Sequence, residues 1–336
     1  MGPLYVLSFR DLKAGHGGAV LPGALFEVSD VSNGFDWTTP AFSDRWRQQP
    51  GLRWLREQER LELLQGKDVW FVTHGFNVNR DNGFKSLGAA AQELRGLGVN
   101  YPAPAADVLV IPVLWPGDWI IPVVTYPWEL HDARKTGEMF ANFLLDGWCD
   151  IARASFISHS LGARVVLETV QQTVSKAGPG ARPDFDAAVL MAPAADDTVF
   201  DDPQYAQAVA ALQRLIVLSS VKDKVLGVAY VLGDPIEAAL WRGEHASTHA
   251  LGLKGPRLKK DSPARPKTEW YPIPTAPAPL HGSNDHGDYL PAPGGPPTDG
   301  WTPKRLDALA FCHGVLAANL PQPAWLMRNT SIPEAG

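Results

Sequence analysis

The sequence predicts an α/β fold with a mostly parallel central sheet and helices on both faces. Short, uniformly apolar runs recur along the 336-residue chain, and stretches with helical periodicity lie between them. Apolar runs without alternation are typical of strands buried on both faces. Their alternation with helices is typical of parallel strands joined by helical crossovers. Because a chain of this length can bury most of its apolar surface around one core, we expect a single domain over residues 1–336.

Each expected element follows from the local pattern of apolar residues. The expected strands are residues 4–9, 69–73, 108–114, 156–158, 187–191 and 215–219. Apolar residues at intervals of three and four predict helices over 84–94, 163–174 and 306–316. Residues 228–303, which are rich in proline toward their end, are expected to form a long, loop-rich excursion.

Composition excludes several classes of function. The 30 lysines and arginines are balanced by 36 aspartates and glutamates, which argues against a nucleic-acid partner. The apolar stretch 119–128 is interrupted by prolines and is far shorter than the roughly 20 residues that cross a bilayer, so no membrane span is expected. With only Cys149 and Cys312, and a start that does not resemble a signal peptide, the chain is expected to be cytoplasmic. Nothing in the pattern indicates an oligomeric state.

Ser160 is the candidate nucleophile. It lies in Ser158-His159-Ser160-Leu161-Gly162, where an apolar run turns directly into a helical pattern. Such a turn holds a serine in a strained conformation with its hydroxyl exposed at the top of a sheet, and small residues flank it to avoid clashes. The usual pattern is Gly-x-Ser-x-Gly, and Ser158 replaces the first glycine here.

A serine hydroxyl needs a histidine as base and a carboxylate to orient that histidine. Asp223 follows the predicted strand 215–219, and His286 lies before the last helical pattern, so the order along the chain is Ser, Asp, His. Alternatives remain open for both roles. Asp196 and Asp197 follow the preceding strand and could supply the acid, while Asp223, between two lysines, could form a surface ion pair. His281 competes with His286 as the base.

Two backbone N–H groups are expected to bind the oxyanion. One belongs to Leu161, which follows the candidate nucleophile, and the other to Phe76 in the run His74-Gly75-Phe76 at the end of a strand. His74 and His159 are expected to support these turns through hydrogen bonds. His245 and His249 are four residues apart but lack the His-Glu-x-x-His pattern of a zinc helix, so no metal site is expected.

Aromatic residues are dense just after the strand 108–114. We expect residues 117–130 to form an apolar flap over Ser160, with Trp115 and Trp119 contacting the substrate, because ligand sites are largely apolar. Plain core beneath a loop is the alternative for this stretch.

Several strand-end motifs appear in order between positions 69 and 290. They are His74-Gly75-Phe76-Asn77, Leu114-Trp115-Pro116-Gly117, Ser158-His159-Ser160-Leu161-Gly162, Ala192-Pro193 with Asp196 and Asp197, Val221-Lys222-Asp223-Lys224-Val225-Leu226, Leu251-Gly252-Leu253-Lys254-Gly255-Pro256, and His286 with Tyr289. In these motifs the chain resembles an α/β-hydrolase of a little-characterised bacterial lipase- and esterase-like group. Gly117-Asp118-Trp119 departs from that group, where a serine more often follows the proline.

The resemblance implies a serine hydrolase with neither metal nor cofactor, acting on a small-molecule carboxylic ester through an acyl-enzyme. The same residues could act on thioesters, lactones or amides, because a fold does not choose among them. A catalytically silent scaffold that binds a ligand or a partner protein is the alternative from another class.

Overall fold

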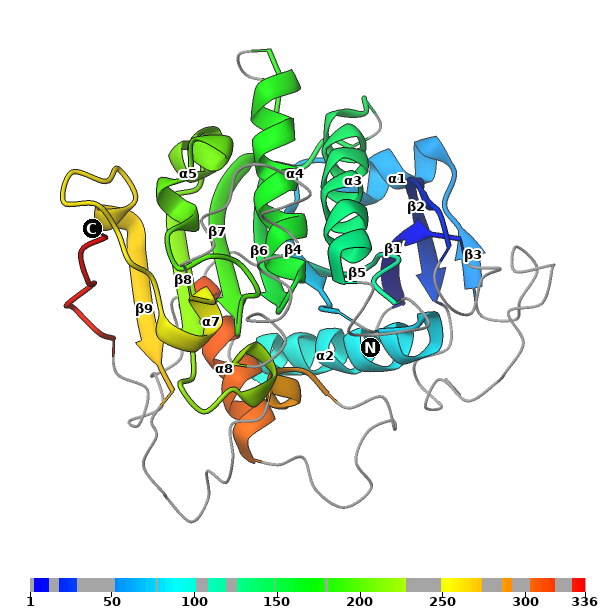
Figure 1. The fold of residues 1–336 in the computed structure, drawn as a ribbon. Coiled ribbons are helices and arrows are strands. Elements are labelled where there is room, and N and C mark those ends of the chain that lie inside the picture. The colour runs from blue at the N-terminus through cyan, green and yellow to red at the C-terminus, as the bar shows by residue number, and fades with distance from the viewer. Residues whose placement is uncertain are drawn as a thin grey trace.

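A nine-stranded sheet forms the centre of the protein. The computed structural model describes residues 3–11, 18–28, 52–76, 78–100, 108–118, 126–147, 149–178, 181–227, 249–273, 286–291, 303–317 and 328–335. Within these residues the strand order is β3-β2-β1-β5-β4-β6-β7-β8-β9 (Figure 1). The strands are β1 (Leu4–Arg10), β2 (Val20–Val28), β3 (Leu52–Trp54), β4 (Asp68–Thr73), β5 (Val108–Leu114), β6 (Arg153–His159), β7 (Asp184–Met191), β8 (Arg214–Ser219) and β9 (Thr268–Pro272).

The sheet is parallel from β1 through β5, β4, β6, β7 and β8 to β9, and β2 runs antiparallel to both β1 and β3. Strands β4 and β6 pair in register from Asp68 with Arg153 to Thr73 with Ser158. Each of these two strands has five consecutive buried residues, as expected for strands covered on both faces. The parallel register brings their carboxyl ends to one edge of the sheet.

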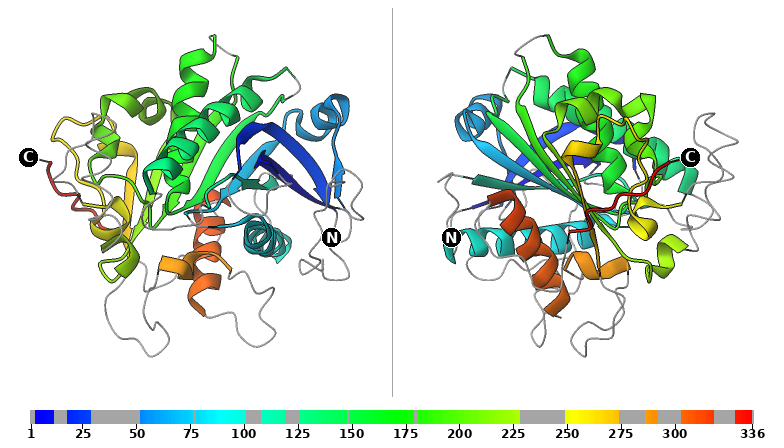
Figure 2. Two further views of the ribbon diagram at one scale, coloured as in Figure 1. Left: turned by 45° about the vertical axis from the view of Figure 1, so that its right-hand side comes forward. Right: turned by 90° about the vertical axis from the view of Figure 1, so that its left-hand side faces the viewer.

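Helices cover both faces of the sheet, which confirms the expected α/β architecture. Figure 2 shows α2 and α8 on one face and α3, α4 and α5 on the other. The α-helices are α1 (Glu57–Leu64), α2 (Arg80–Asn100), α3 (Tyr126–Leu145), α4 (Gly162–Lys176), α5 (Ala206–Ala211), α7 (Leu251–Lys254) and α8 (Pro303–Ala317). Helix α4, which follows Ser160, is buried without interruption from Gly162 to Val170 because the sheet and α3 enclose it.

Strands β2, β3 and β9 were not among the expected elements. Strand β2 contains a Pro-Gly pair and is only partly buried, so its sequence lacks the uniform apolar pattern of a central strand. Strand β9 lies inside the region expected to be loop-rich and is a short edge strand ending at Pro272, a position where proline is tolerated. Of that region, 228–248, 274–285 and 292–302 lie outside the described residues.

The expected flap over 117–130 differs from the structure in its second half. Residues 119–125 lie outside the described residues, and helix α3 begins at Tyr126. Pro127 reads as a helix breaker within an irregular stretch, but the first turn of a helix tolerates proline because its N–H needs no intrahelical acceptor. Gly137 lets α3 approach α4 closely, since a Cβ at that position would lie 2.5 Å from Glu168 Cβ.

In the described part of the chain, no helix combines the length and the apolar character needed to cross a membrane.

Candidate active site

Ser160 lies in a sharp turn between β6 and α4. Its φ of 53° is in the left-handed region that side chains other than glycine rarely adopt. The turn is held on both sides, because the Ser160 N–H donates to Met191 O at 2.9 Å and the Ala163 N–H donates to Ser160 O at 3.1 Å. Gly162 is required here, since a Cβ would lie 2.5 Å from His74 O. The local geometry is that of a nucleophile elbow.

Ser160, His286 and Asp223 lie within hydrogen-bond distance of one another in a chain. His286 Nε2 lies 2.7 Å from Ser160 Oγ, and His286 Nδ1 lies 2.7 Å from Asp223 Oδ2. A carboxylate oxygen only accepts, so Nδ1–H donates to Asp223 and Nε2 is left to accept the serine proton. Asp223 Oδ1 accepts the Leu226 N–H at 2.9 Å, which orients the carboxylate.

The alternative acids and base are placed differently. Asp197 is buried and accepts from Arg257 Nε at 2.7 Å and Nη2 at 3.0 Å, so its two oxygens serve a bidentate ion pair. The backbone of Asp196 forms a bridge with Ala250. His281 lies outside the described residues. Among the candidate acids and bases that the structure describes, Asp223 and His286 are the pair linked to Ser160 by hydrogen bonds.

His74 supports the loop that follows β4, which we call the His74 loop. Its Nδ1 lies 2.9 Å from Gly75 O, and its Nε2 lies 3.3 Å from the Trp115 backbone N. Because a carbonyl accepts and an N–H donates, the ring carries its proton on Nδ1 and is neutral. Burial lowers the pKa of His74 to about 3, which agrees with this neutral form.

The orientation of the Gly75–Phe76 peptide follows from this hydrogen bond. In a trans peptide the C=O and the N–H point in opposite directions. Because Gly75 O points at His74, the Phe76 N–H points away from that ring. Gly75 itself lies against the elbow, where a Cβ would be 2.6 Å from Ser160 Cβ. The Leu161 N–H lies beside Ser160 at the N-terminus of α4, where backbone N–H groups have no intrahelical acceptor. Gly75 and Leu161 therefore both lie next to the serine, and the two oxyanion donors stay a prediction.

The burial of His74 predicts a loss of stability in acid. The unfolded side chain takes up a proton near pH 6.5, whereas the folded one stays neutral down to about pH 3. Between these values the unfolded chain binds more protons, so lowering the pH favours unfolding. At about pH 4.5 the expected loss is about 3 kcal/mol, from about 1.4 kcal/mol per pH unit.

Urea unfolding at about pH 7 and about pH 4.5 measures this loss. His74→Asn is the comparison, because its amide can still donate to Gly75 O but does not titrate. We expect the free energy of unfolding of the variant to depend less on pH by about the same 3 kcal/mol. An equal pH dependence in the two proteins would contradict the assignment.

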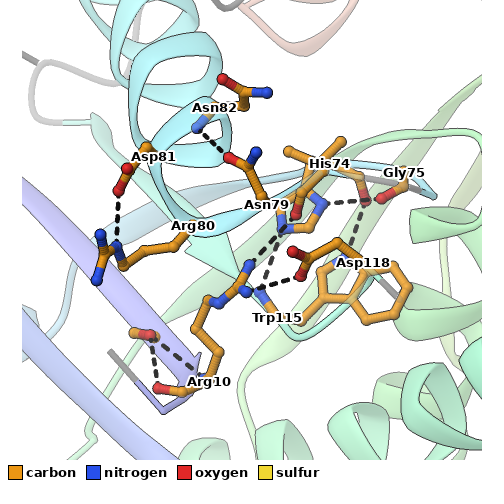
Figure 3. A network of polar contacts seen from close by, with 11 residues as sticks. Arg10, His74, Gly75, Asn79, Arg80, Asp81, Asn82, Trp115 and Asp118 are labelled. Atoms are coloured by element: carbon orange, nitrogen blue, oxygen red, sulfur yellow. Dashed lines mark hydrogen bonds and ion pairs between the residues drawn. The ribbon is translucent and has the colours of Figure 1, made fainter. Parts of the chain in front are cut away.

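Arg10, at the end of β1, ties together the loops that follow β4 and β5 (Figure 3). Its Nη2 donates to Asp118 Oδ1 at 2.7 Å and its Nη1 donates to Val78 O at 3.2 Å. Both charged side chains are fully or almost fully buried. The bridge between Val78 and Gly117 joins the same two loops through their backbones. Breaking a buried ion pair by removing one partner is costly, so this contact restrains the base of the His74 loop.

Asn79 completes this support from the helix side. Its Oδ1 accepts the Asn82 N–H at 2.8 Å, which is the N-cap arrangement for helix α2 beginning at Arg80 (Figure 3). The His74 loop is thus held by a histidine, a buried ion pair and a capped helix.

Trp115 supports His74 rather than forming an open wall. Its Nε1 donates to His74 O at 2.9 Å, the two rings stack with centroids 5.4 Å apart, and the residue is fully buried. This placement differs from the expected substrate contact, because no surface of the side chain is open. Trp119 lies outside the described residues.

The sequence reasoning missed Arg10 and Asp118. An arginine that ends an otherwise apolar strand is the signal that could have drawn attention to Arg10, because a buried charge needs a partner. No local pattern identifies that partner 108 residues away.

No group of three or more histidine, cysteine or acidic side chains that could hold a metal occurs among the described residues. His245 lies outside them. His249 contributes its carbonyl to the Asp197 N–H at 2.8 Å.

A nucleophile elbow at the carboxyl edge of a mostly parallel sheet, with helices on both faces, defines the class of the α/β hydrolases. The chain belongs to the family described as alpha/beta hydrolase of unknown function (DUF900), which matches residues 53–239. Ser160 and Asp223 lie inside the matched region and His286 lies beyond it. No curated protein matches the chain. The expected fold and the resemblance to a little-characterised α/β-hydrolase group are confirmed, and the reaction has to be argued from the site.

Proposed function

We propose that this protein is a serine hydrolase that cleaves carboxylic esters of small molecules through an acyl-enzyme. The single observation that carries the proposal is the hydrogen-bonded chain of Ser160, His286 and Asp223, with 2.7 Å at both contacts of the imidazole. A serine on a strained elbow, a base within reach of its hydroxyl and an acid that orients the base meet the geometric requirements for nucleophilic catalysis.

The proposed reaction follows from the proton positions. His286 Nε2 takes the proton of Ser160 Oγ as the oxygen attacks the ester carbonyl, and Asp223 stabilises the imidazolium that forms. The imidazolium then gives its proton to the leaving alcohol. Water attacks the acyl-enzyme with His286 again as base, which restores the serine and releases the acid. The tetrahedral oxyanion is bound by the N–H groups of Phe76 and Leu161.

The proposal is tested by exposing the purified protein and its Ser160→Ala variant to a fluorophosphonate probe and to p-nitrophenyl acetate, butyrate and octanoate. We expect covalent labelling on the Ser160 peptide and turnover of at least one ester, with both lost in the variant. A folded protein that is neither labelled nor active would overturn the proposal in favour of a silent scaffold. Labelling without ester turnover would overturn the ester assignment and direct the search to thioesters, lactones or amides.

Gly75→Ala tests the proposed oxyanion site while keeping Ser160, His286 and Asp223 in the sequence. The added methyl would lie 2.6 Å from Ser160 Cβ and so displace the Gly75–Phe76 peptide. Removing one oxyanion donor lowers kcat by about 10²- to 10³-fold, and a loss of this size is expected here.

Gly96→Ala is the matched control, because a Cβ in that part of α2 meets nothing within 4 Å. It should leave kcat unchanged and, as a helix-interior glycine, gain about 0.5–1 kcal/mol in the free energy of unfolding. Equal kcat values for the Gly75→Ala variant and the wild type would refute the oxyanion assignment.

A further inference from the structure

His159, the residue before the proposed nucleophile, contacts the segment that carries His286. Its Nε2 lies 2.7 Å from the backbone O of His286, across 127 residues of sequence. The carbonyl can only accept, so the proton of the imidazole is on Nε2 and the bond is a donation from His159. Burial lowers the pKa of His159 well below its ordinary value, which keeps the ring neutral while it donates.

The ring of His159 lies between two loops of the site. Its centroid is 4.7 Å from that of His286 and 5.8 Å from that of Tyr289, both in the short 3-10 helix η6 (His286–Tyr289). On its other side, a Cβ added to Gly75 would lie 3.2 Å from His159 Nδ1. The His159 side chain therefore packs both against η6, which carries His286, and against the loop that follows β4, which carries Gly75.

The two ring nitrogens of His286 are both used in the polar chain with Ser160 and Asp223. These bonds fix the orientation of the imidazole ring. The ring can reach both partners only if the backbone of residue 286 is held at the correct distance from Ser160. The bond from His159 to the carbonyl of that same residue restrains the main chain at this point. A misplacement of about 1 Å at a reacting group can cost about 10²-fold in rate.

We propose that His159 is a positioning residue that holds the main chain of His286 so that Nε2 stays on Ser160 Oγ. This inference rests on the proposed serine-hydrolase function. It assigns a specific task to the second residue of the elbow sequence, which acts through the backbone carbonyl of His286. The proposed positioning of His286 depends on a single hydrogen bond donated by His159. A different side chain that supplies the same donor should therefore preserve kcat.

The test compares His159→Gln with His159→Asn, which have the same amide chemistry and differ by one methylene. The glutamine amide nitrogen can occupy the place of imidazole Nε2 and donate to His286 O, whereas the asparagine amide is too short. We expect His159→Asn to lower kcat about 10²-fold with KM within about threefold, and His159→Gln to retain most of the wild-type kcat. Because the two substitutions disturb packing to a similar extent, a merely structural role would lower both alike.

A second readout is independent of turnover. The proton that His286 Nδ1 donates to Asp223 Oδ2 is expected to give a downfield NMR resonance, which should be present in the wild type and in His159→Gln and be lost or broadened in His159→Asn. A wild-type kcat in His159→Asn, or equal losses of kcat and of the resonance in both variants, would overturn the positioning role. If the wild type shows the resonance but neither hydrolyses esters nor reacts with fluorophosphonate, the proposed function fails. The resonance would still report whether His159 holds His286.

Discussion

Ser160→Ala and His286→Ala are each expected to lower kcat for the best p-nitrophenyl ester by about 10⁶-fold, and the double variant is expected to be no slower than either single one. The reason is that the hydroxyl and the imidazole act as a unit. Without its base the serine of this site is a weak nucleophile, and without the serine the base has no proton to take. The residual rate is expected from substrate binding and from the proposed oxyanion donors of Phe76 and Leu161, which all three variants retain.

Controls for this cycle come from the same elements of the chain. Ser155→Ala removes another buried hydroxyl from β6, where Ser155 Oγ donates to Asp186 at 3.3 Å. His249→Ala removes an exposed imidazole that serves the structure through its backbone carbonyl. Both should retain kcat within a factor of a few, judged as surface or single-hydrogen-bond changes. Effects of the two site substitutions that multiply in the double variant would mean that Ser160 and His286 act independently, which the proposed mechanism does not allow.

The local sequence pattern predicts those strands that are buried along most of their length. Strands β4, β5, β6, β7 and β8 are buried along most of their length, so each contains an apolar run that was predicted, although only residues 156–158 of β6 were. Strand β9, at the sheet edge, has two buried and three half-buried residues, and strand β2 is only partly buried. In these two strands the apolar pattern is weak, and pairing with a neighbour decides the conformation.

The candidate site shows the same division. The order of Ser160, Asp223 and His286 at the ends of predicted elements was enough to place them together, because parallel strands bring their carboxyl ends to one edge. The sequence favoured Asp223 and left Asp197 open as the acid, because the ion pair of Asp197 with Arg257, 60 residues away, could not be predicted. The contacts of Arg10 with Asp118 and of His159 with His286 also join distant segments. Such pairs depend on side-chain geometry that periodicity does not encode.

Asp223→Asn is expected to lower kcat by about 10⁴-fold while leaving the protein folded. The carboxylate accepts the His286 Nδ1 proton at 2.7 Å. An amide nitrogen turned toward the ring would instead donate to Nδ1 and so favour the tautomer with its proton on Nε2. That nitrogen could then no longer accept from Ser160 Oγ. The loss therefore comes from a misplaced proton rather than from a missing contact, and it should appear in kcat more than in KM.

Asp197→Asn separates this effect from the general cost of removing a buried carboxylate. Asp197 is fully buried and its two oxygens accept from Arg257, so the variant should lose about 1.5–3 kcal/mol in the free energy of unfolding, the range for a hydrogen bond to a charged group. Its kcat should stay within a factor of a few of the wild type.

The two isosteric substitutions are thus expected to give opposite results, a large loss of activity with little loss of stability at position 223 and the reverse at position 197. The opposite pair of results would identify Asp197, which follows β7, as the acid. The reason is that replacing the carboxylate that sets the histidine tautomer by an amide is what lowers kcat.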